Sequence, residues 1–320
     1  MIQSFLKPML PTLSEELPTG EKWVYEVKYD GFRCLLYWDH SLITMTSRNG
    51  HPFHTIFPEI PDYLKSVQHK VKHLLPLLVD GELCILADSY KANFEYIQKR
   101  GRLKQTERII QSAKLFPSSF CAFDLLAFNG QYTFQEPFMN RKKSLKSVFE
   151  MLGIDVSHVE KSSFINFVPY SADEKSIDDL VKKKDSEGIV AKTIHSKWSA
   201  GTRTTQWIKV KNLKIGVFIL LGYDTENSFF HVGLVKGTTI QPVGLFAHGI
   251  STEEKEALIH IVKRNQSEKK GSFIRIEPSL CVELSFLEWY KEQLRQPRFI
   301  RFRFDADWED CTWEKLQRNN

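Results

Sequence analysis

Short apolar stretches of strand length, separated by turn residues, dominate the start of the chain. Residues 23–30 and 32–38 have the composition of β-strands and meet at Gly31. Residues 42–47 predict a third strand, which ends in the turn sequence Arg48-Asn49-Gly50. We therefore expect the first 50 residues to be antiparallel.

The middle of the chain mixes strand-like and helix-like segments. Apolar runs at 76–86 and 120–128 predict strands, and the spacing of apolar residues between them, within 92–110, predicts helices. Two further helices are predicted at 141–152 and 173–184, each followed by a strand-like stretch. Because strands and helices do not alternate regularly, the pattern favours an α+β fold over a doubly wound parallel sheet.

The pattern changes after residue 211. Three strand-like segments are followed by a predicted helix at 252–264 and by strands at 273–277 and 281–286. Five strands and one helix in about 100 residues are typical of a Greek-key barrel of the OB type. We therefore predict two domains, 1–211 and 212–320, which agrees with the number expected for 320 residues.

Charge and cysteine content limit the class of protein. The chain has 44 Lys and Arg against 39 Asp and Glu, and residues 212–320 carry 15 of each sign, so the whole excess lies in 1–211. This excess permits a polyanionic partner without requiring one. The five cysteines lack metal-site spacing, which favours a reducing compartment and argues against structural zinc.

Membrane insertion and secretion are both disfavoured. The longest apolar run, residues 217–221, is far shorter than the roughly 20 residues that cross a bilayer. The N-terminus has Lys7 and Pro8 where a signal peptide needs an unbroken apolar stretch. We expect a cytoplasmic protein that does not bind a membrane.

The candidate chemistry starts at Lys28, which is followed by Tyr29, Asp30 and Gly31. Alone, this short pattern fits a surface strand end as well as a nucleophile. It stands, however, at the head of an ordered series of short motifs: 47–50 (SRNG), 80–82 (DGE), 123–126 (FDLL), 187–192 (EGIVAK), 207–211 (WIKVK) and 298–303 (RFIRFR).

This series resembles the covalent nucleotidyltransferases, specifically the ATP-dependent DNA ligases, over nearly the whole chain. Residues 26–33, 94–100 and 282–289 look like the ligase module of bacterial end-joining DNA ligase D. The resemblance implies a nucleotidyltransferase domain of mixed, largely antiparallel sheets with helices, followed by an OB barrel. It also implies a stand-alone monomeric ligase whose barrel closes over ATP about a hinge near 212–216.

The chemistry of ligation explains the residue types. An amine that attacks the α-phosphate of ATP forms a phosphoramidate, and the AMP then passes to a 5′-phosphate, where it becomes a good leaving group. By resemblance Lys28 is this amine, with Asp30 beside it. If Lys209 or Lys211 lies about 6 Å away, each contributes roughly 3 kcal/mol of repulsion, which would lower the pKa of Lys28.

The resemblance also implies the remaining roles. Nucleotide contacts are expected from Glu26 with Val27, Arg33, Glu82 and Phe123, and contacts to the α-phosphate from Lys209 and Lys211. Arg298, Arg301 and Arg303 would orient the β- and γ-phosphates. Glu187 and Glu82 would hold Mg²⁺, with Mn²⁺ as a substitute.

DNA contacts are expected from Arg48, which would bind the 5′-phosphate of a nick, and from a dense basic segment formed by Lys99, Arg100, Arg102, Lys104 and Arg108. We expect these residues to contact backbone phosphates rather than to read bases. The implied substrate is duplex DNA with nicks or ends, in repair near the nucleoid, with a Ku-like end-binding protein as a possible partner.

Other readings remain open. A GTP-using capping enzyme or an RNA ligase shares the lysine and the carboxylates, and a catalytically inactive DNA-end scaffold is a further alternative. An NAD-dependent ligase would need further modules. The sequence also departs from the family at Asp305, which is followed by Ala306 where a lysine is often found.

Overall fold

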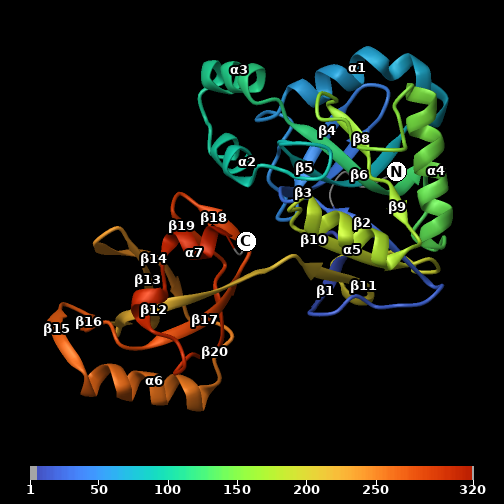
Figure 1. The fold of residues 1–320 in the computed structure, drawn as a ribbon. Helices are drawn as coiled ribbons and strands as arrows, with labels where there is room; N and C mark the ends of the chain where they lie inside the picture. The colour runs from blue at the N-terminus through green and yellow to red at the C-terminus, as the bar shows by residue number, and fades with distance from the viewer. Residues whose placement is uncertain (1–5, 319–320) are drawn as a thin grey trace. The chain divides into compact units, whose positions relative to one another are not determined.

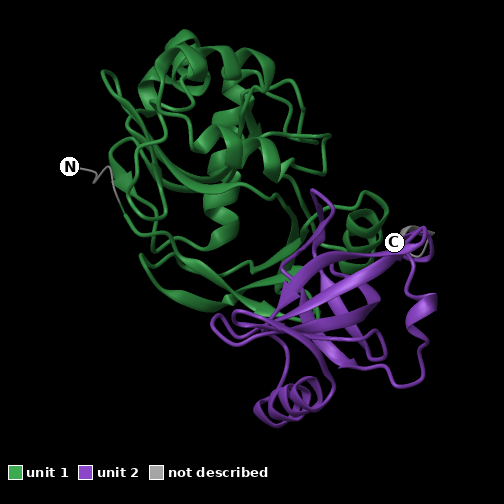
Figure 2. Ribbon diagram, turned by 90° about the vertical axis from the view of Figure 1, so that its left-hand side faces the viewer, with its two compact units in different colours: residues 1–212 green, residues 213–320 purple. Residues whose placement is uncertain are grey.

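The structure is a computed structural model that describes residues 6–318. The chain divides into two compact units, 1–212 and 213–320, which Figure 2 shows in separate colours. This division lies one residue from the predicted boundary. Among the described residues, no helix combines the length and apolar character that a membrane crossing demands.

Unit 1 contains a six-stranded sheet. Its order is β4-β3-β5-β6-β7, with β8 pairing alongside β6 in parallel and the other pairs antiparallel. The strands are β3 (Phe32–Trp38), β4 (Ile43–Ser47), β5 (Leu77–Cys84), β6 (Ser119–Phe128), β7 (Gln131–Tyr132) and β8 (Ile165–Phe167).

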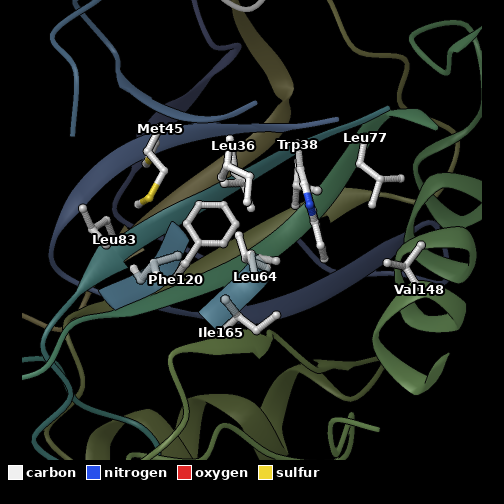
Figure 3. Close-up of a cluster of buried hydrophobic side chains, with 14 of the residues drawn as sticks. Leu36, Trp38, Met45, Leu64, Leu77, Leu83, Phe120, Val148 and Ile165 are labelled. Atoms are coloured by element: carbon white, nitrogen blue, oxygen red, sulfur yellow. The ribbon is translucent and has the colours of Figure 1, made fainter. Parts of the chain in front are cut away.

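One face of this sheet is apolar and is covered by α1 (Glu59–Val71) and α4 (Phe138–Leu152) (Figure 1). Strand side chains such as Leu36 and Trp38 meet Leu64 of α1 and Val148 of α4 there (Figure 3). Because successive strand residues alternate between faces, the opposite face presents Arg33, Glu82 and their neighbours.

A second sheet of unit 1 has the order β1-β11-β10-β2-β9. β1 runs parallel to β11, and the other pairs are antiparallel. α5 (Glu174–Lys183) packs on β2 and β10 (Figure 1). The strands are β1 (Leu10–Ser14), β2 (Trp23–Lys28), β9 (Tyr170–Ser171), β10 (Gly188–Thr193) and β11 (Arg203–Lys211). Unit 1 therefore has the predicted α+β class with mixed sheets.

The prediction for the first 50 residues, consecutive antiparallel strands in one arrangement, is only partly correct. β3 and β4 form an antiparallel hairpin, but β2 pairs with β10 and β9 in the other sheet. The chain changes sheets at Gly31, where a Cβ atom would lie 2.2 Å from the carbonyl oxygen of Leu83. A side chain at this position is sterically excluded, so glycine makes the crossing possible.

Three short elements complete the helical part of unit 1. The predicted helical region is divided into α2 (Phe94–Gly101) and α3 (Thr106–Leu115), and η1 (Lys72–Leu74) follows α1. The side chain of Asn93 caps α2 by accepting from the backbone N–H of Tyr96. α1 was not predicted from the sequence.

Unit 2 is built around the long strand β12 (Lys214–Asp224). β12 pairs with β17 along residues 214–219 and with β16 along 222–224. β13 and β14 extend the sheet on one side, and β20 pairs with β17. The other strands are β13 (Phe229–Lys236), β14 (Thr239–Phe246), β15 (Gln266–Lys270), β16 (Phe273–Ile276), β17 (Cys281–Phe286), β18 (Glu288–Tyr290), β19 (Gln293–Arg295) and β20 (Arg298–Phe302).

Helix α6 (Thr252–Arg264) lies between β14 and β15 in the chain, as predicted, and begins with a capping box formed by Ser251 and Glu254. η2 (Trp308–Asp310) and α7 (Trp313–Arg318) follow β20. Part of the segment predicted as a hinge, 212–216, is regular structure, because residues from Lys214 onward belong to β12.

The junction residue Asn212 is bound to unit 1. Its backbone N–H donates to the carbonyl oxygen of Glu187 at 2.9 Å, and its side-chain amide donates to that of Ser186 at 3.1 Å. Asn212 and Leu213 lie between β11 and β12, and Leu213 is the first residue of unit 2.

Candidate active site

Three neighbouring strands, β2, β10 and β11, carry polar side chains on one shared face. In the ladders, Lys28 pairs with Gly188 and Gly188 with Lys211, while Glu26 pairs with Val190 and Val190 with Lys209. Residues that pair directly across strands share a face, so Glu26, Lys28, Lys209 and Lys211 all project to the same side.

Gly188 stands in the middle of this row for a steric reason. Its φ is +151°, and a Cβ atom there would lie 2.1 Å from the carbonyl oxygen of Val210. Only glycine tolerates both conditions. The position between Lys28 and Lys211 therefore has no side chain.

Lys28 is bound by a carboxylate. Its Nζ donates to Glu187 Oε2 at 2.5 Å, with the two side chains 21% and 9% exposed. Burial acts to lower the pKa of Lys28, but the charges of Glu187, Glu82 and Asp30 outweigh it and raise the pKa above its ordinary value. In this state Lys28 is a charged ion-pair partner.

The predicted lowering of the Lys28 pKa is thus wrong for this state of the protein. The repulsion among the lysines is present, but its effect falls on Lys209, whose pKa is lowered by burial and by the charges of Lys28 and Lys211. Lys28 differs because a carboxylate oxygen of Glu187 directly accepts a hydrogen bond from it. This ion pair stabilises the charged form of Lys28 and opposes its deprotonation.

Glu26 is a fully buried carboxylate held by two lysines. Its oxygens accept from Lys142 Nζ and Lys192 Nζ, each at 2.5 Å, and all three side chains are at most 2% exposed. Burial lowers the pKa of both lysines, that of Lys192 to about 8. We refer to Glu26, Lys142 and Lys192 as the buried triad.

The ring of Phe123 lies beside the buried triad. Lys192 Nζ is 4.2 Å and the guanidinium carbon of Arg33 is 4.3 Å from its centroid, distances typical of cation–π contacts. The register of β6 against β5 shifts at Phe123, so this residue is the extra residue of a β-bulge. Phe123 therefore contacts both the buried triad and Arg33.

Arg33 is fixed by a second buried carboxylate. Its Nε and Nη2 donate to Asp80 at 2.6 and 2.7 Å, in a bidentate pair. Burial raises the pKa of Asp80, against the opposing effect of Arg33. Glu82, which pairs with Arg33 in the ladder, has a pKa raised to about 8 by burial, partly offset by Lys28 and Arg33.

Two other predicted contact residues lie outside this row of polar side chains. The side chain of Val27 pairs with Ile189 on the opposite face of the sheet from Lys28, so only its backbone can reach the site. Arg48 is exposed in the turn after β4.

The basic segment around α2 and α3 contains one residue that the sequence placed wrongly. The side chain of Arg100 is 1% exposed and forms an ion pair with Glu59 of α1. It is therefore a core residue and is unsuitable for a DNA contact. Lys99, Arg102, Lys104 and Arg108 are exposed.

The three arginines of unit 2 lie on and just after β20. Arg298 and Arg301 are exposed, while Arg303 is 23% exposed. Arg301 and Arg303 both donate to Glu283 of β17, and Arg303 also forms a bidentate pair with Asp305. These carboxylates stabilise the charged guanidinium groups.

Comparison with known proteins connects these features to a family. The model of the ATP-dependent DNA ligase domain matches residues 6–211, which include both sheets of unit 1. The chain belongs to this family.

Individual relatives of this ligase-family chain cover nearly all of it. The protein named bifunctional non-homologous end joining protein LigD of Bacillus subtilis is 35% identical over 98% of the chain and 51% of its own length. The DNA ligase of Thermococcus fumicolans is 24% identical over 95% of the chain and 57% of its own length. The chain thus spans about half the length of the curated relatives it matches.

A solved structure supports the fold of this ligase-family chain. The ligase domain of LigD from M. tuberculosis matches with a TM-score of 0.53 and 21% identity, covering 95% of this chain and 98% of the other.

Sequence reasoning missed Lys142 of this ligase-family chain and gave Lys192 no role. A signal for Lys142 exists, because Phe138, Arg141, Lys142 and Leu145 occupy the i, i+3, i+4 and i+7 positions of the buried stripe of α4. Basic residues on an apolar stripe indicate buried counter-charges; Arg141 indeed forms a bidentate pair with Asp124.

Proposed function

We propose that this chain seals 5′-phosphate/3′-hydroxyl nicks or breaks in duplex DNA, using ATP and a covalent AMP on Lys28. The observation that carries the proposal is the row of Lys28, Gly188 and Lys211 across three strands, with Glu187 bound to Lys28. This row presents an amine, a carboxylate and a second cation in one place, which a phosphoryl-transfer site requires.

In the first step, the neutral Nζ of Lys28 attacks the α-phosphorus of ATP. A phosphorus–nitrogen bond forms, the bond to the bridging oxygen breaks, and pyrophosphate leaves. Lys28 must lose a proton first, and its ion pair with Glu187 opposes this. Lys209, whose pKa is lowered, and Lys211 border the position where charge develops on the α-phosphate.

The nucleotide pocket is formed by the buried triad and Phe123. Each oxygen of a carboxylate has two lone pairs, so Glu26 can accept from an adenine amino group while keeping both lysines. Stacking of the base on Phe123 contributes about 1–3 kcal/mol. Arg33 and Glu82 are the proposed ribose contacts, with Arg33 oriented by Asp80.

Glu187 and Glu82 are the proposed holders of Mg²⁺, with Mn²⁺ as a substitute. Their carboxylate oxygens suit a hard cation that takes its remaining ligands from water and phosphate. No group of three or more His, Cys, Asp or Glu side chains within 6–318 could form a complete protein site. When bound with ATP, the ion would neutralise phosphate charge, and Glu187 would release Lys28.

Unit 2 is proposed to be an OB-type domain that acts on the same reaction. A seven-stranded sheet with α6 between its third and fourth strands in chain order supports this assignment. Arg298, Arg301 and Arg303 would orient the β- and γ-phosphates after exchanging Glu283 and Asp305 for phosphate oxygens. Arg48, Lys99, Arg102 and Lys104 are the proposed DNA contacts.

We also propose a role in DNA repair by end joining. Support comes from the name of the Bacillus subtilis relative. A Ku-like end-binding protein would then be a partner.

The deciding experiment measures AMP transfer to the purified full chain. Incubation with labelled ATP and Mg²⁺ should label Lys28, and Lys28→Arg, which keeps the positive charge, should remove the label. The exposed Lys161→Arg variant is the matched control and should label normally. Label on another lysine would overturn the assignment of Lys28, and transfer from GTP in place of ATP would favour a capping enzyme.

A further inference from the structure

Two cysteines of unit 2, Cys281 and Cys311, lie next to each other. Their sulfur atoms are 3.5 Å apart, and the residues are 1% and 6% exposed. Both are anchored by backbone hydrogen bonds, since the carbonyl oxygen of Cys281 accepts from Arg303 and that of Cys311 from Val235. The fold therefore holds the two thiols together.

A cavity of about 450 Å³ adjoins this pair. Cys311 lines it, together with Glu283, Arg303, Asp305 and Asp310. The lining combines these charged side chains with apolar ones such as Leu316, and the volume corresponds to many waters at about 30 Å³ each, so a small polar solute can reach Cys311 through it. The acidic side chains favour a neutral oxidant such as hydrogen peroxide over an anion.

We propose that Cys281 and Cys311 are a modification site that forms a reversible disulfide on reaction with a peroxide. One thiolate attacks a peroxide oxygen, which gives a sulfenic acid and releases hydroxide. The second sulfur then attacks the sulfenic sulfur, and the hydroxyl group leaves as water. In total, two thiols and one hydrogen peroxide give one disulfide and two waters.

The geometry suits this reaction. The sulfurs must approach from 3.5 Å to about 2.05 Å, a distance within reach of side-chain torsions. The hydrogen bond between the two sulfurs lowers the pKa of Cys281, against the effect of burial, which favours a thiolate within the pair, next to the cavity that Cys311 lines.

The disulfide would restrain the arginine that the proposed function assigns to ATP. Cys281 is the first residue of β17, which also carries Glu283, the hydrogen-bond partner of Arg303. Cys311 lies at the end of the segment 303–311, which begins with Arg303. A covalent link between them keeps Arg303 beside Glu283. Oxidation is then expected to slow self-adenylation, a consequence that rests on the proposed function.

The chain contains an internal control. Cys84 and Cys121 in unit 1 are 3.6 Å apart, nearly the same separation, but both are 0% exposed and neither lines the unit 2 cavity. If access through the cavity decides reactivity, this pair stays reduced while Cys281 and Cys311 react.

The test treats the folded full chain with hydrogen peroxide, then denatures it, alkylates free thiols and maps the peptides without reduction. We expect a Cys281–Cys311 cross-link that dithiothreitol reverses, with Cys84 and Cys121 alkylated. Cys311→Ser, or Cys281→Ser if the first variant does not fold, should abolish the cross-link, whereas Cys121→Ser should leave it intact. Alkylation of all five cysteines, equal oxidation of both pairs, or a sulfinic acid on Cys311 without a cross-link would overturn the proposal.

Self-adenylation is measured on the same samples. The oxidised chain should be slowed several-fold and recover with dithiothreitol, while Cys311→Ser should not respond to peroxide. A cross-linked chain with an unchanged rate would overturn the restraint on Arg303. A reduced chain that takes no AMP at all would instead contradict the proposed function. It would not contradict the proposal that Cys281 and Cys311 form a disulfide.

Discussion

The buried triad of unit 1 and the arginine pairs of unit 2 use the same type of interaction in opposite environments. Glu26 and its two lysines are at most 2% exposed, whereas Arg301 is 63% exposed beside Glu283. A buried charge that loses its partner is strongly destabilising, while an exposed pair exchanges partners at little cost. Unit 1 thus keeps its charges fixed in place, and unit 2 holds arginines that can change partners.

The largest expected effect comes from breaking the buried triad. Glu26→Gln leaves two buried lysines without a counter-charge and should lower the free energy of unfolding by about 3–5 kcal/mol. Glu150→Gln, in an exposed pair with Lys146, is the control and should change it by less than about 0.5 kcal/mol. Denaturant unfolding measures both, and equal effects would refute the contrast.

The next largest effect is the pH dependence of stability, which has opposite signs for Glu82 in unit 1 and Glu283 in unit 2. The folded-state pKa of Glu82 is raised from 4.5 to about 8, so the folded state binds the extra proton between these values. The contribution of Glu82 to stability is present below pH 4.5 and is lost as pH rises towards 8. Glu82→Gln should gain stability relative to the parent chain over this window, by about 1.4 kcal/mol for each pH unit.

Glu283 provides the contrasting curve. Its pKa is lowered by its hydrogen bond to Arg301, so its contribution is present above pH 4.5 and is lost as pH falls below that value. Unfolding of Glu82→Gln and of Glu283→Gln, measured from pH 3 to 9, should show the two variants diverging from the parent chain in opposite directions as pH rises. Parallel curves would contradict the assigned shifts.

A smaller effect is expected from the arginines. Arg303→Ala should slow self-adenylation roughly 10–100-fold through lost charge stabilisation, yet change the stability of unit 2 by less than about 1 kcal/mol. Sealing of a nick that already carries AMP should be largely spared, because pyrophosphate has already left. Equal loss of both activities in a folded variant would indicate a DNA contact instead.

The smallest effect is on DNA binding. If about five phosphates are neutralised, log K should fall against log salt with a slope near −4 to −5. Lys104→Ala should make this slope less steep by about one unit, and Lys161→Ala should not. A salt-independent affinity would exclude phosphate contacts as the main source of binding.

The sequence predicted most of the strands and the residues that meet on the shared face of β2, β10 and β11. These came from local patterns: alternation predicted the strands, and the motif around Lys28 predicted the residue that the proposed function assigns as the nucleophile. The sheet to which β2 belongs was not predictable in this way, because pairing with β10 joins residues about 160 positions apart.

Local sequence patterns also could not predict which charged residues form pairs with each other. Arg100 looked like a surface residue because its neighbours are basic, but Glu59 lies on a helix that the sequence analysis missed. The predicted pKa shift of Lys28 was wrong for the same reason. Lysine spacing was visible in the sequence, whereas the contact with Glu187 depends on the folded chain.

The attachment of Asn212 has a mechanical consequence. Since its backbone is hydrogen-bonded to Glu187 and its amide to Ser186, tension applied to the chain at Leu213 acts first on the turn that holds the carboxylate bound to Lys28. Forces on the connection between the units therefore pull on the ion pair itself. A pull on the linker is thus transmitted through the hydrogen bonds of Asn212 towards the residue that the proposed function assigns as the nucleophile.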